Sequence, residues 1–318
     1  MVKEPSNRLN IGPQYAKDKP FTARMRFHQS WYRSEVLKAP YGTGPKPSNT
    51  TWFGNMLTLA DGERGLNFHT PHIFEIAKRR LAMRKGIIDP FRLFCNMLSS
   101  QPMCFNLFGP LVDNLELATQ LVQVILPGEI QTVSKVQFEY APESARDYLN
   151  DRTAFDAFIS FTRPDNQPGF IGVETKLVEA FSAKVYSSLL YNHWTEHNFS
   201  PWPTEARTHL QSIDINQLWR DHLLAVAMQL APGSPYGSGR FLLVYHPLDV
   251  ACVAALNIYK TLLKPEDQSF IAMPLDMVVE KWRQAVSTTA EKQWLTNFSL
   301  RYLDLHVSET EYLAEEVR

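Results

Sequence analysis

The hydrophobic periodicity of the sequence changes near Gln131, and this change constrains the fold more than any other feature. Residues 112–126 carry apolar side chains at the three- and four-residue spacing of an amphipathic helix. Apolar and polar side chains then alternate over residues 133–140, as on a half-buried strand. Two mainly apolar segments, 155–161 and 169–178, are predicted to be further strands because the turn-forming sequence TRPDNQP separates them.

Helical spacing returns over residues 214–230, and residues 241–247 form a short apolar segment typical of a buried strand. The order helix, three strands, helix, strand predicts an α/β fold with a mixed β-sheet flanked by helices. Residues 248–305 are expected to be mostly helical.

The two ends of the chain differ in composition from this central part. Residues 1–66 are rich in proline and basic side chains, so we expect a partly irregular N-terminal arm with one helix from residue 22 to 37. The α/β domain would span residues 67–306 and include a basic helix over residues 71–85. The acidic residues 307–318 are expected to form a solvated C-terminal tail.

The composition excludes several classes of protein. Hydrophobic residues make up 44% of the 318-residue chain, which is enough for a buried core, and the formal net charge is −1. Nucleic-acid binding would therefore depend on a local basic surface. No apolar segment is long enough to cross a membrane, and the N-terminal residues lack the apolar block of a signal peptide. The three cysteines suit buried thiols in a reducing compartment, so we expect a cytoplasmic protein without a membrane partner.

Ionisable side chains interrupt the two central apolar strands: Asp156 lies in the first, and Glu174 and Lys176 lie in the second. Because side chains alternate between the faces of a strand, Glu174 and Lys176 share a face. A hairpin register that pairs Phe161 with Phe170 would bring Asp156 close to both. Burying such ions is costly unless they pair with one another or bind a cation.

Two neighbouring carboxylates favour Mg²⁺, which prefers oxygen ligands and retains several waters. A metal held in this way orients and activates a water and neutralises charge on a phosphate oxygen. A lysine two residues beyond the second carboxylate reaches the same water, so the combination suits phosphodiester hydrolysis. The alternative, on these residues alone, is a structural ion pair between an acid and a lysine on a partly exposed sheet.

The sequence FDAFISF, a short turn and IGVETK, followed by a helix that carries Gln217, resembles the PD-(D/E)XK nuclease superfamily, and in particular a group of bacterial restriction-endonuclease-like proteins. The resemblance runs from Asn67 to His246 and implies the restriction-endonuclease-like αβββαβ core. Phe155 stands where the name of the superfamily has proline. The residues that the resemblance makes catalytic are Asp156, Glu174, Lys176 and Gln217, with Asp156 and Glu174 as the metal ligands.

Further residues are candidates for binding metal or nucleic acid. Glu139 ends the preceding strand and is a third candidate metal ligand, a residue that orients the ligands, or a solvent-facing glutamate. The candidate nucleic-acid-binding residues are Arg24, Arg26, Arg79, Arg80 and Arg220.

The resemblance implies a divalent-metal-dependent endonuclease that acts on DNA, with Mg²⁺ or Mn²⁺ as the cofactor. It also implies a role in restriction or defence against foreign DNA, with a homodimer or proteins of a defence complex as partners. A catalytically silent module of a defence complex, binding nucleic acid or protein, is the alternative from another class.

A zinc peptidase is a more remote alternative. His193, Glu196 and His197 match the H-x-x-E-H pattern, which requires both imidazoles to lie one helical turn apart. The sequence NFSPWP follows at once and cannot continue a helix.

Overall fold

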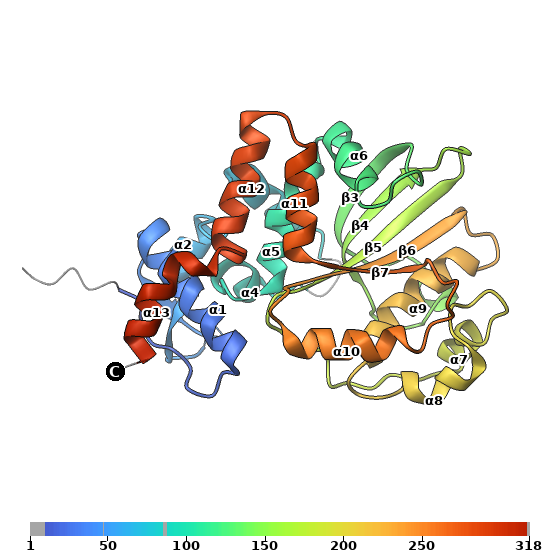
Figure 1. Ribbon diagram of the computed structural model, residues 1–318, viewed down its shortest axis with the longest axis horizontal. Helices are drawn as coiled ribbons and strands as arrows, with labels where there is room; N and C mark the ends of the chain where they lie inside the picture. Colours follow the sequence, from blue (N-terminus) through green and yellow to red (C-terminus); the bar gives the residue numbers. More distant parts are fainter. Residues whose placement is uncertain (1–9, 47, 85–87, 317–318) are drawn as a thin grey trace, which may run out of the picture.

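A five-stranded mixed sheet, in the right half of Figure 1, forms the core of the larger lobe of the protein. The computed structural model describes residues 10–46, 48–84 and 88–316. Across the sheet the strands are β3 (Thr132–Tyr140), β4 (Phe155–Thr162), β5 (Pro168–Lys176), β6 (Ser238–Tyr245) and β7 (Phe270–Pro274). The pairs β3–β4 and β4–β5 are antiparallel, and the pairs β5–β6 and β6–β7 are parallel. The predicted α/β fold with a mixed sheet is therefore confirmed.

Helices cover both faces of the sheet (Figure 1). One face packs against α5 (Ser100–Phe108), α6 (Leu115–Gln123), α11 (Leu275–Ala285) and α12 (Thr289–Tyr302). The other face packs against α7 (Leu189–Thr195), α8 (Arg207–Leu210), α9 (Asn216–Leu230) and α10 (Val250–Lys260). Alternation along the strands fills both cores, since Ile159 and Val173 belong to the first core and Phe158 and Phe170 to the second.

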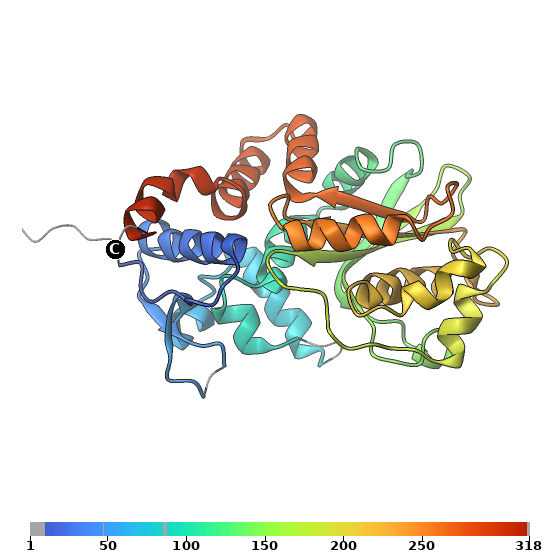
Figure 2. The same ribbon diagram turned by 60° about the horizontal axis from the view of Figure 1, so that its bottom comes forward.

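The other elements form a second lobe beside the sheet (Figures 1 and 2). They are α1 (Pro20–Trp31), a π-helical turn (Tyr32–Val36), β1 (Tyr41–Thr43), β2 (Trp52–Leu57), α2 (Leu59–Glu63), α4 (Pro90–Cys95) and α13 (Glu309–Glu316). Helix α3 (Pro71–Ala82) contacts α5. Short 3₁₀ turns span Gly109–Leu111, Ala145–Asp147, Thr204–Ala206 and Leu305–Ser308.

Side-chain caps begin two of the helices, and the prediction of buried thiols is confirmed. The Thr70 side chain caps α3 by accepting a hydrogen bond from the Ile73 N–H, and Asn114 caps α6 in the same way through Leu117. The three cysteines are buried and free. Helix α3 ends at Ala82, and residues 85–87, where its end was expected, lie outside the described residues. None of the described helices is both long and apolar enough to cross a membrane.

Other predictions are corrected by the structure. Strand β7 lies within the region expected to be mostly helical, and β1 and β2 pair within the arm. The acidic C-terminal segment is a helix that packs on one side and is exposed on the other: Glu309 lies 2.7 Å from Arg24 and the Tyr312 ring packs against Phe27, while Leu313 is 52% exposed.

The hairpin of β4 and β5 differs from the expected register by one residue, since Phe161 pairs with Gly169 rather than with Phe170. The turn spans residues 163–167, is closed by a 2.9 Å hydrogen bond from the Arg163 N–H to the Gln167 carbonyl, and has Asn166 in the left-handed region at φ 63°. The geometry of a turn fixes the register of its hairpin. Counted from the turn, the last regular pair is Ala157 with Val173. Asp156 and Glu174 are the next residues on the two strands.

Candidate active site

Three carboxylates from three adjacent strands lie close together where the regular pairing of β4 and β5 ends. Asp156 Oδ2 accepts hydrogen bonds from the Thr175 N–H and the Thr175 hydroxyl, both at 2.8 Å. Glu139 lies between the same two register pairs of β3 and β4 as Asp156, and its backbone is left-handed at φ 50°. Its Oε1 accepts a 3.2 Å hydrogen bond from Gln101 Nε2. The left-handed residue breaks the regular alternation of β3 at this point.

Glu174, Lys176 and Gln217 form one connected group. Lys176 Nζ lies 3.1 Å from Glu174 Oε1, and Gln217 Nε2 donates to the same oxygen at 2.9 Å. Gln217 Oε1 accepts from Lys176 Nζ at 3.3 Å and from the Ser182 N–H at 2.8 Å. Because Gln217 lies in the first turn of α9, this helix fixes both charged groups at the end of β5. The four predicted catalytic residues are thus brought together.

Burial and neighbouring charges shift the pKa values of both Asp156 and Lys176. The pKa of Asp156 is raised well above its ordinary value because the carboxyl is desolvated and lies near Glu174 and Glu139. Burial lowers the pKa of Lys176, but the carboxylates of Glu174, Glu179 and Asp156 outweigh it and raise this pKa above its ordinary value. The lysine therefore stays an ammonium at neutral pH.

A cavity of about 380 Å³ opens over these side chains. Asp156, Glu174, Lys176 and Gln217 line it together with cationic side chains: Arg92, Arg152, Lys184 and Arg220. The Arg220 guanidinium lies over the Tyr186 ring at 4.8 Å and 3.4 Å from Asp221 Oδ1. The cavity thus presents acids at its floor and several cations around it, which suits a phosphate bound next to a metal.

Glu179 was not predicted as a site residue, although it follows the E-T-K sequence closely. Its Oε1 accepts from the Ser100 N–H at 2.7 Å and the Ser100 hydroxyl at 3.0 Å, and it pairs with Arg92. Burial raises the pKa of Glu179, but Arg92 and Ser100 outweigh it and hold this pKa below its ordinary value. Glu179 therefore joins the end of β5 to the start of α5.

Asp221 is a second acid that sequence reasoning missed. It lies one turn after Gln217 on α9, and its spacing from Gln217 was the available signal. Burial and the nearby Glu174 raise the pKa of Asp221 to about 7. Its Oδ2 is buried and has no hydrogen-bond partner among the described residues.

The donor set fits a hard divalent cation. Asp156 and Glu174 supply carboxylate oxygens, and the raised pKa of Asp156 reflects negative charge that a cation would compensate. No three His, Cys, Asp or Glu side chains in the described part of the chain form a group that could hold a metal. A bound Mg²⁺ would therefore complete its coordination with water, and Glu139 as an additional ligand stays a prediction.

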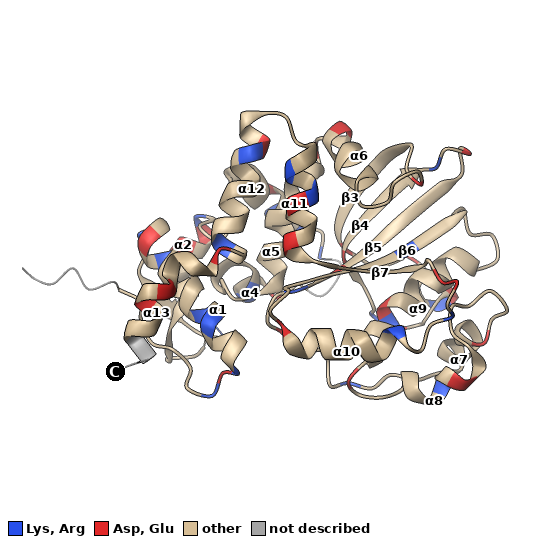
Figure 3. Ribbon diagram, in the orientation of Figure 1, with Lys and Arg blue, Asp and Glu red and all other residues tan. Residues whose placement is uncertain are grey.

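The candidate nucleic-acid-binding arginines are dispersed, as are the charged residues of both lobes (Figure 3). Arg220 lines the catalytic cavity. Arg80 donates to the Phe138 and Glu139 carbonyls at 2.6 and 2.7 Å, and Arg79 pairs with Asp113 at 3.1 Å. Arg24 and Arg26 lie in α1 and pair with Glu309 and Asp18, so the structure does not bring them to the cavity.

The H-x-x-E-H sequence does not form a zinc site. Helix α7 ends at Thr195, so Glu196 and His197 lie beyond it. Glu196 pairs with Arg207, and the rings of His193 and His197 are 6.4 Å apart. Helix α7 ends before His197, so it does not place the two imidazoles one helical turn apart. The zinc-peptidase alternative is therefore wrong.

A helix-flanked mixed sheet with two carboxylates and a lysine at the end of its central strands defines the restriction-endonuclease-like class of α/β proteins. The chain belongs to the PD-(D/E)XK nuclease superfamily, whose family model matches residues 16–304. No curated protein and no solved structure matches the chain.

Proposed function

We propose that the protein is a divalent-metal-dependent endonuclease that hydrolyses phosphodiester bonds of DNA. The observation that carries the proposal is the convergence of Asp156, Glu174 and Lys176 on one polar cavity, with Lys176 Nζ 3.1 Å from Glu174 Oε1. Membership of the nuclease superfamily supports the class of reaction.

Each residue of the cavity has a distinct task in hydrolysis. Asp156 and Glu174 would hold Mg²⁺, or Mn²⁺, which supplies charge neutralisation and an activated water when bound. Lys176 remains an ammonium next to Glu174 and stabilises negative charge on the attacking oxygen and on the phosphate. As water adds to phosphorus, the bond to the leaving oxygen breaks, and that oxygen takes up a proton. Gln217 holds Glu174 and Lys176 in position for this step.

Cations around the cavity would bind the backbone of the substrate. Arg220 lines the cavity with Arg152 and Lys184, and such contacts give affinity without sequence information. The same superfamily resemblance supports a role in restriction or defence against foreign DNA, performed by a homodimer or with partner proteins of a defence complex.

The test is incubation of the purified protein with plasmid and single-stranded DNA, with Mg²⁺, with Mn²⁺ and with a chelator. We expect cleavage with either metal, none with the chelator, and none by Glu174→Ala. The Lys176→Ala variant distinguishes the silent binding module: a nuclease loses cleavage and keeps DNA binding, whereas a silent module cuts nothing in its unaltered form. A matched control is Lys292→Ala on the exposed face of α12.

A further inference from the structure

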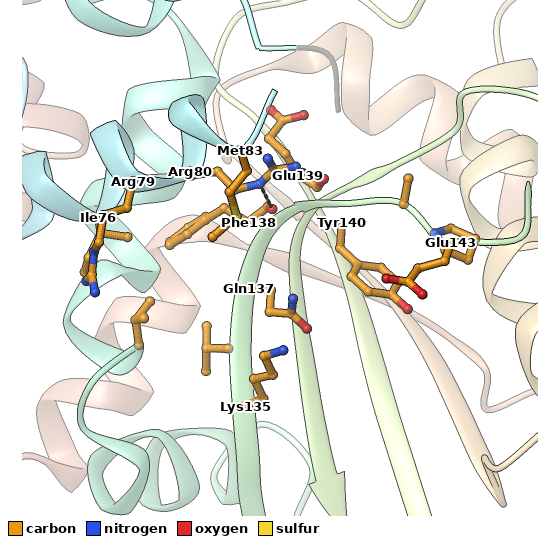
Figure 4. Close-up of a pocket in the computed structure, with 14 residues that line it drawn as sticks. Ile76, Arg79, Arg80, Met83, Lys135, Gln137, Phe138, Glu139, Tyr140 and Glu143 are labelled. Carbon is orange, nitrogen blue, oxygen red and sulfur yellow. Dashed lines mark hydrogen bonds between the residues drawn. The ribbon is translucent and has the colours of Figure 1, made fainter. Parts of the chain in front are cut away.

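A second cavity, of about 640 Å³, lies between α3 and the edge strand β3 (Figure 4). We call it the β3 groove. Its walls include Ile76 and Arg79 from α3, Met83 directly after this helix, and Lys135, Gln137 and Tyr140 from β3. The described strands pair with β3 only along β4, so the groove follows the open edge of the sheet.

The β3 groove adjoins the catalytic cavity. Glu139 lines both cavities, and it is the left-handed residue at which β3 leaves its regular alternation. Arg80 holds this part of β3 by donating hydrogen bonds to the carbonyls of Phe138 and Glu139. The three residues lie next to one another in Figure 4. A polymer whose reacting group lies in the catalytic cavity therefore passes close to the β3 groove.

The walls of the β3 groove combine apolar groups and three cationic side chains with two carboxylates, those of Glu139 and Glu143. Met83 is 62% exposed and lies with Ile76 on the α3 side, which offers apolar surface to a flat ring. Lys135 is exposed and has no ion-pair partner in the described part of the chain. Among the described residues, Arg79 forms an ion pair with Asp113 alone, and this exposed pair contributes little. A nucleotide has the complementary chemistry, because it joins an apolar base to an anionic phosphate.

The size of the groove suits a single nucleotide rather than a stacked base pair of duplex DNA. Cavities of roughly 300–1,000 Å³ enclose a single small ligand. In a duplex the bases are stacked inside the helix, so only a nucleotide that has left the stack reaches such a cavity.

We propose that the β3 groove binds an unpaired nucleotide of the substrate strand, next to the phosphate held at Asp156 and Glu174. This inference rests on the proposed nuclease function. It makes single-stranded DNA, or DNA with a locally unpaired nucleotide, the preferred substrate over a fully paired duplex.

The test measures binding of fluorescein-labelled DNA by anisotropy, with Ca²⁺ in place of Mg²⁺. The probes are a short single strand and the same sequence as a duplex. Ala141→Trp fills the groove from its exposed rim, and Lys135→Glu reverses its charge. The matched controls are Ala290→Trp and Lys292→Glu, both at exposed positions of α12 outside the groove. Thermal unfolding verifies that all four variants are folded.

We expect the unaltered protein to bind the single strand more tightly than the duplex. Each groove variant should weaken single-strand binding by about tenfold, which corresponds to about 1.4 kcal/mol, and the controls should not. Equal single-strand binding by folded groove variants and controls overturns the inference, and so does tighter duplex binding that the groove variants retain.

This binding experiment and the cleavage assay described above together separate the two proposals. If the unaltered protein cleaves DNA and the groove variants bind DNA normally, the nucleotide-binding groove is rejected and the nuclease proposal is supported. If the unaltered protein cleaves no DNA but the groove variants lose DNA binding, nucleotide binding in the groove is supported and the nuclease proposal is rejected.

Discussion

Thr175 holds Asp156 with two hydrogen bonds, one from its backbone N–H and one from its hydroxyl, each 2.8 Å long. Thr175 is the residue between Glu174 and Lys176, so the strand that carries the second carboxylate also orients the first. Burial of the Asp156 carboxyl strengthens its dependence on these donors. The hydroxyl at this position therefore matters to the candidate metal site.

Replacing Thr175 by valine removes the hydroxyl and keeps the shape of the side chain. A hydrogen bond to a charged group contributes about 1.5–3 kcal/mol, and the backbone donor remains. We expect Mn²⁺ affinity, measured by titration calorimetry, to fall about tenfold, and the Mg²⁺ concentration needed for half-maximal cleavage to rise with it. Thr296→Val, which removes a hydroxyl on α12 that donates to Lys292 O, is the control. Unaltered metal affinity would show that Thr175 has only a structural role.

Gln217 is a positioning residue, because its amide contacts Glu174 and Lys176. Gln217→Met keeps the length of the side chain and removes both of these hydrogen bonds, together with the one from the Ser182 N–H. We expect kcat to fall by about 10- to 100-fold, in line with the loss of one or two charged hydrogen bonds. KM for DNA should change little because the phosphate-binding cations remain.

Steady-state cleavage kinetics measure the changes in kcat and in KM separately. Gln293→Met, at an exposed position of α12, is the matched control. A rise in KM alone would place Gln217 in substrate binding, and unchanged kinetics would leave it no part in the reaction.

Glu179 should contribute to stability through the contact between β5 and α5. It accepts two hydrogen bonds from Ser100 and pairs with the partly exposed Arg92. We expect Glu179→Ala to lower the free energy of unfolding by about 2 kcal/mol, because the buried Ser100 donors lose a charged acceptor. Arg92→Ala should cost less, since its side chain is 39% exposed. Urea unfolding of both variants measures the order, and a larger loss for Arg92→Ala would contradict it.

The part of the fold that could be predicted is the part that repeats along the chain. Alternation over β3 and helical spacing over α6 are local patterns, so the order of the elements followed from them. Asp156, Glu174 and Lys176 were visible as charges within apolar strands. The register of β4 and β5 was not, because it depends on the left-handed conformation of Asn166 in the turn.

Contacts between distant residues account for what sequence reasoning missed. The basic sequence around Arg24 predicts a phosphate-binding residue, but in the folded chain Arg24 forms an ion pair with Glu309. In the same way, Glu179 meets Arg92 and Ser100 only when α4 and α5 pack against the end of β5. Charge along a sequence does not identify the partner of each ion.

Buried histidines should make the fold sensitive to acid. Burial lowers the pKa of His28, His222 and His246 from 6.5 to about 4, and that of His69 to about 3. Below pH 6.5 the unfolded chain therefore binds protons that the native chain does not. Their contribution to stability is fully present above pH 6.5 and is lost as the pH falls toward 4.

His246 provides the test of this pH dependence. Its Nε2 contacts the Tyr302 carbonyl at 3.1 Å and its Nδ1 accepts from the Leu248 N–H at 3.2 Å, so the neutral ring satisfies both partners and the protonated ring does not. We expect the free energy of unfolding to fall steadily between pH 6.5 and 4. His246→Gln should be less stable at pH 7 but lose stability less steeply, by up to about 1.4 kcal/mol per pH unit for one proton. Urea unfolding across this range measures both slopes, with His306→Gln at an exposed position as the control. Equal slopes for His246→Gln and the unaltered protein would exclude His246 from the acid response.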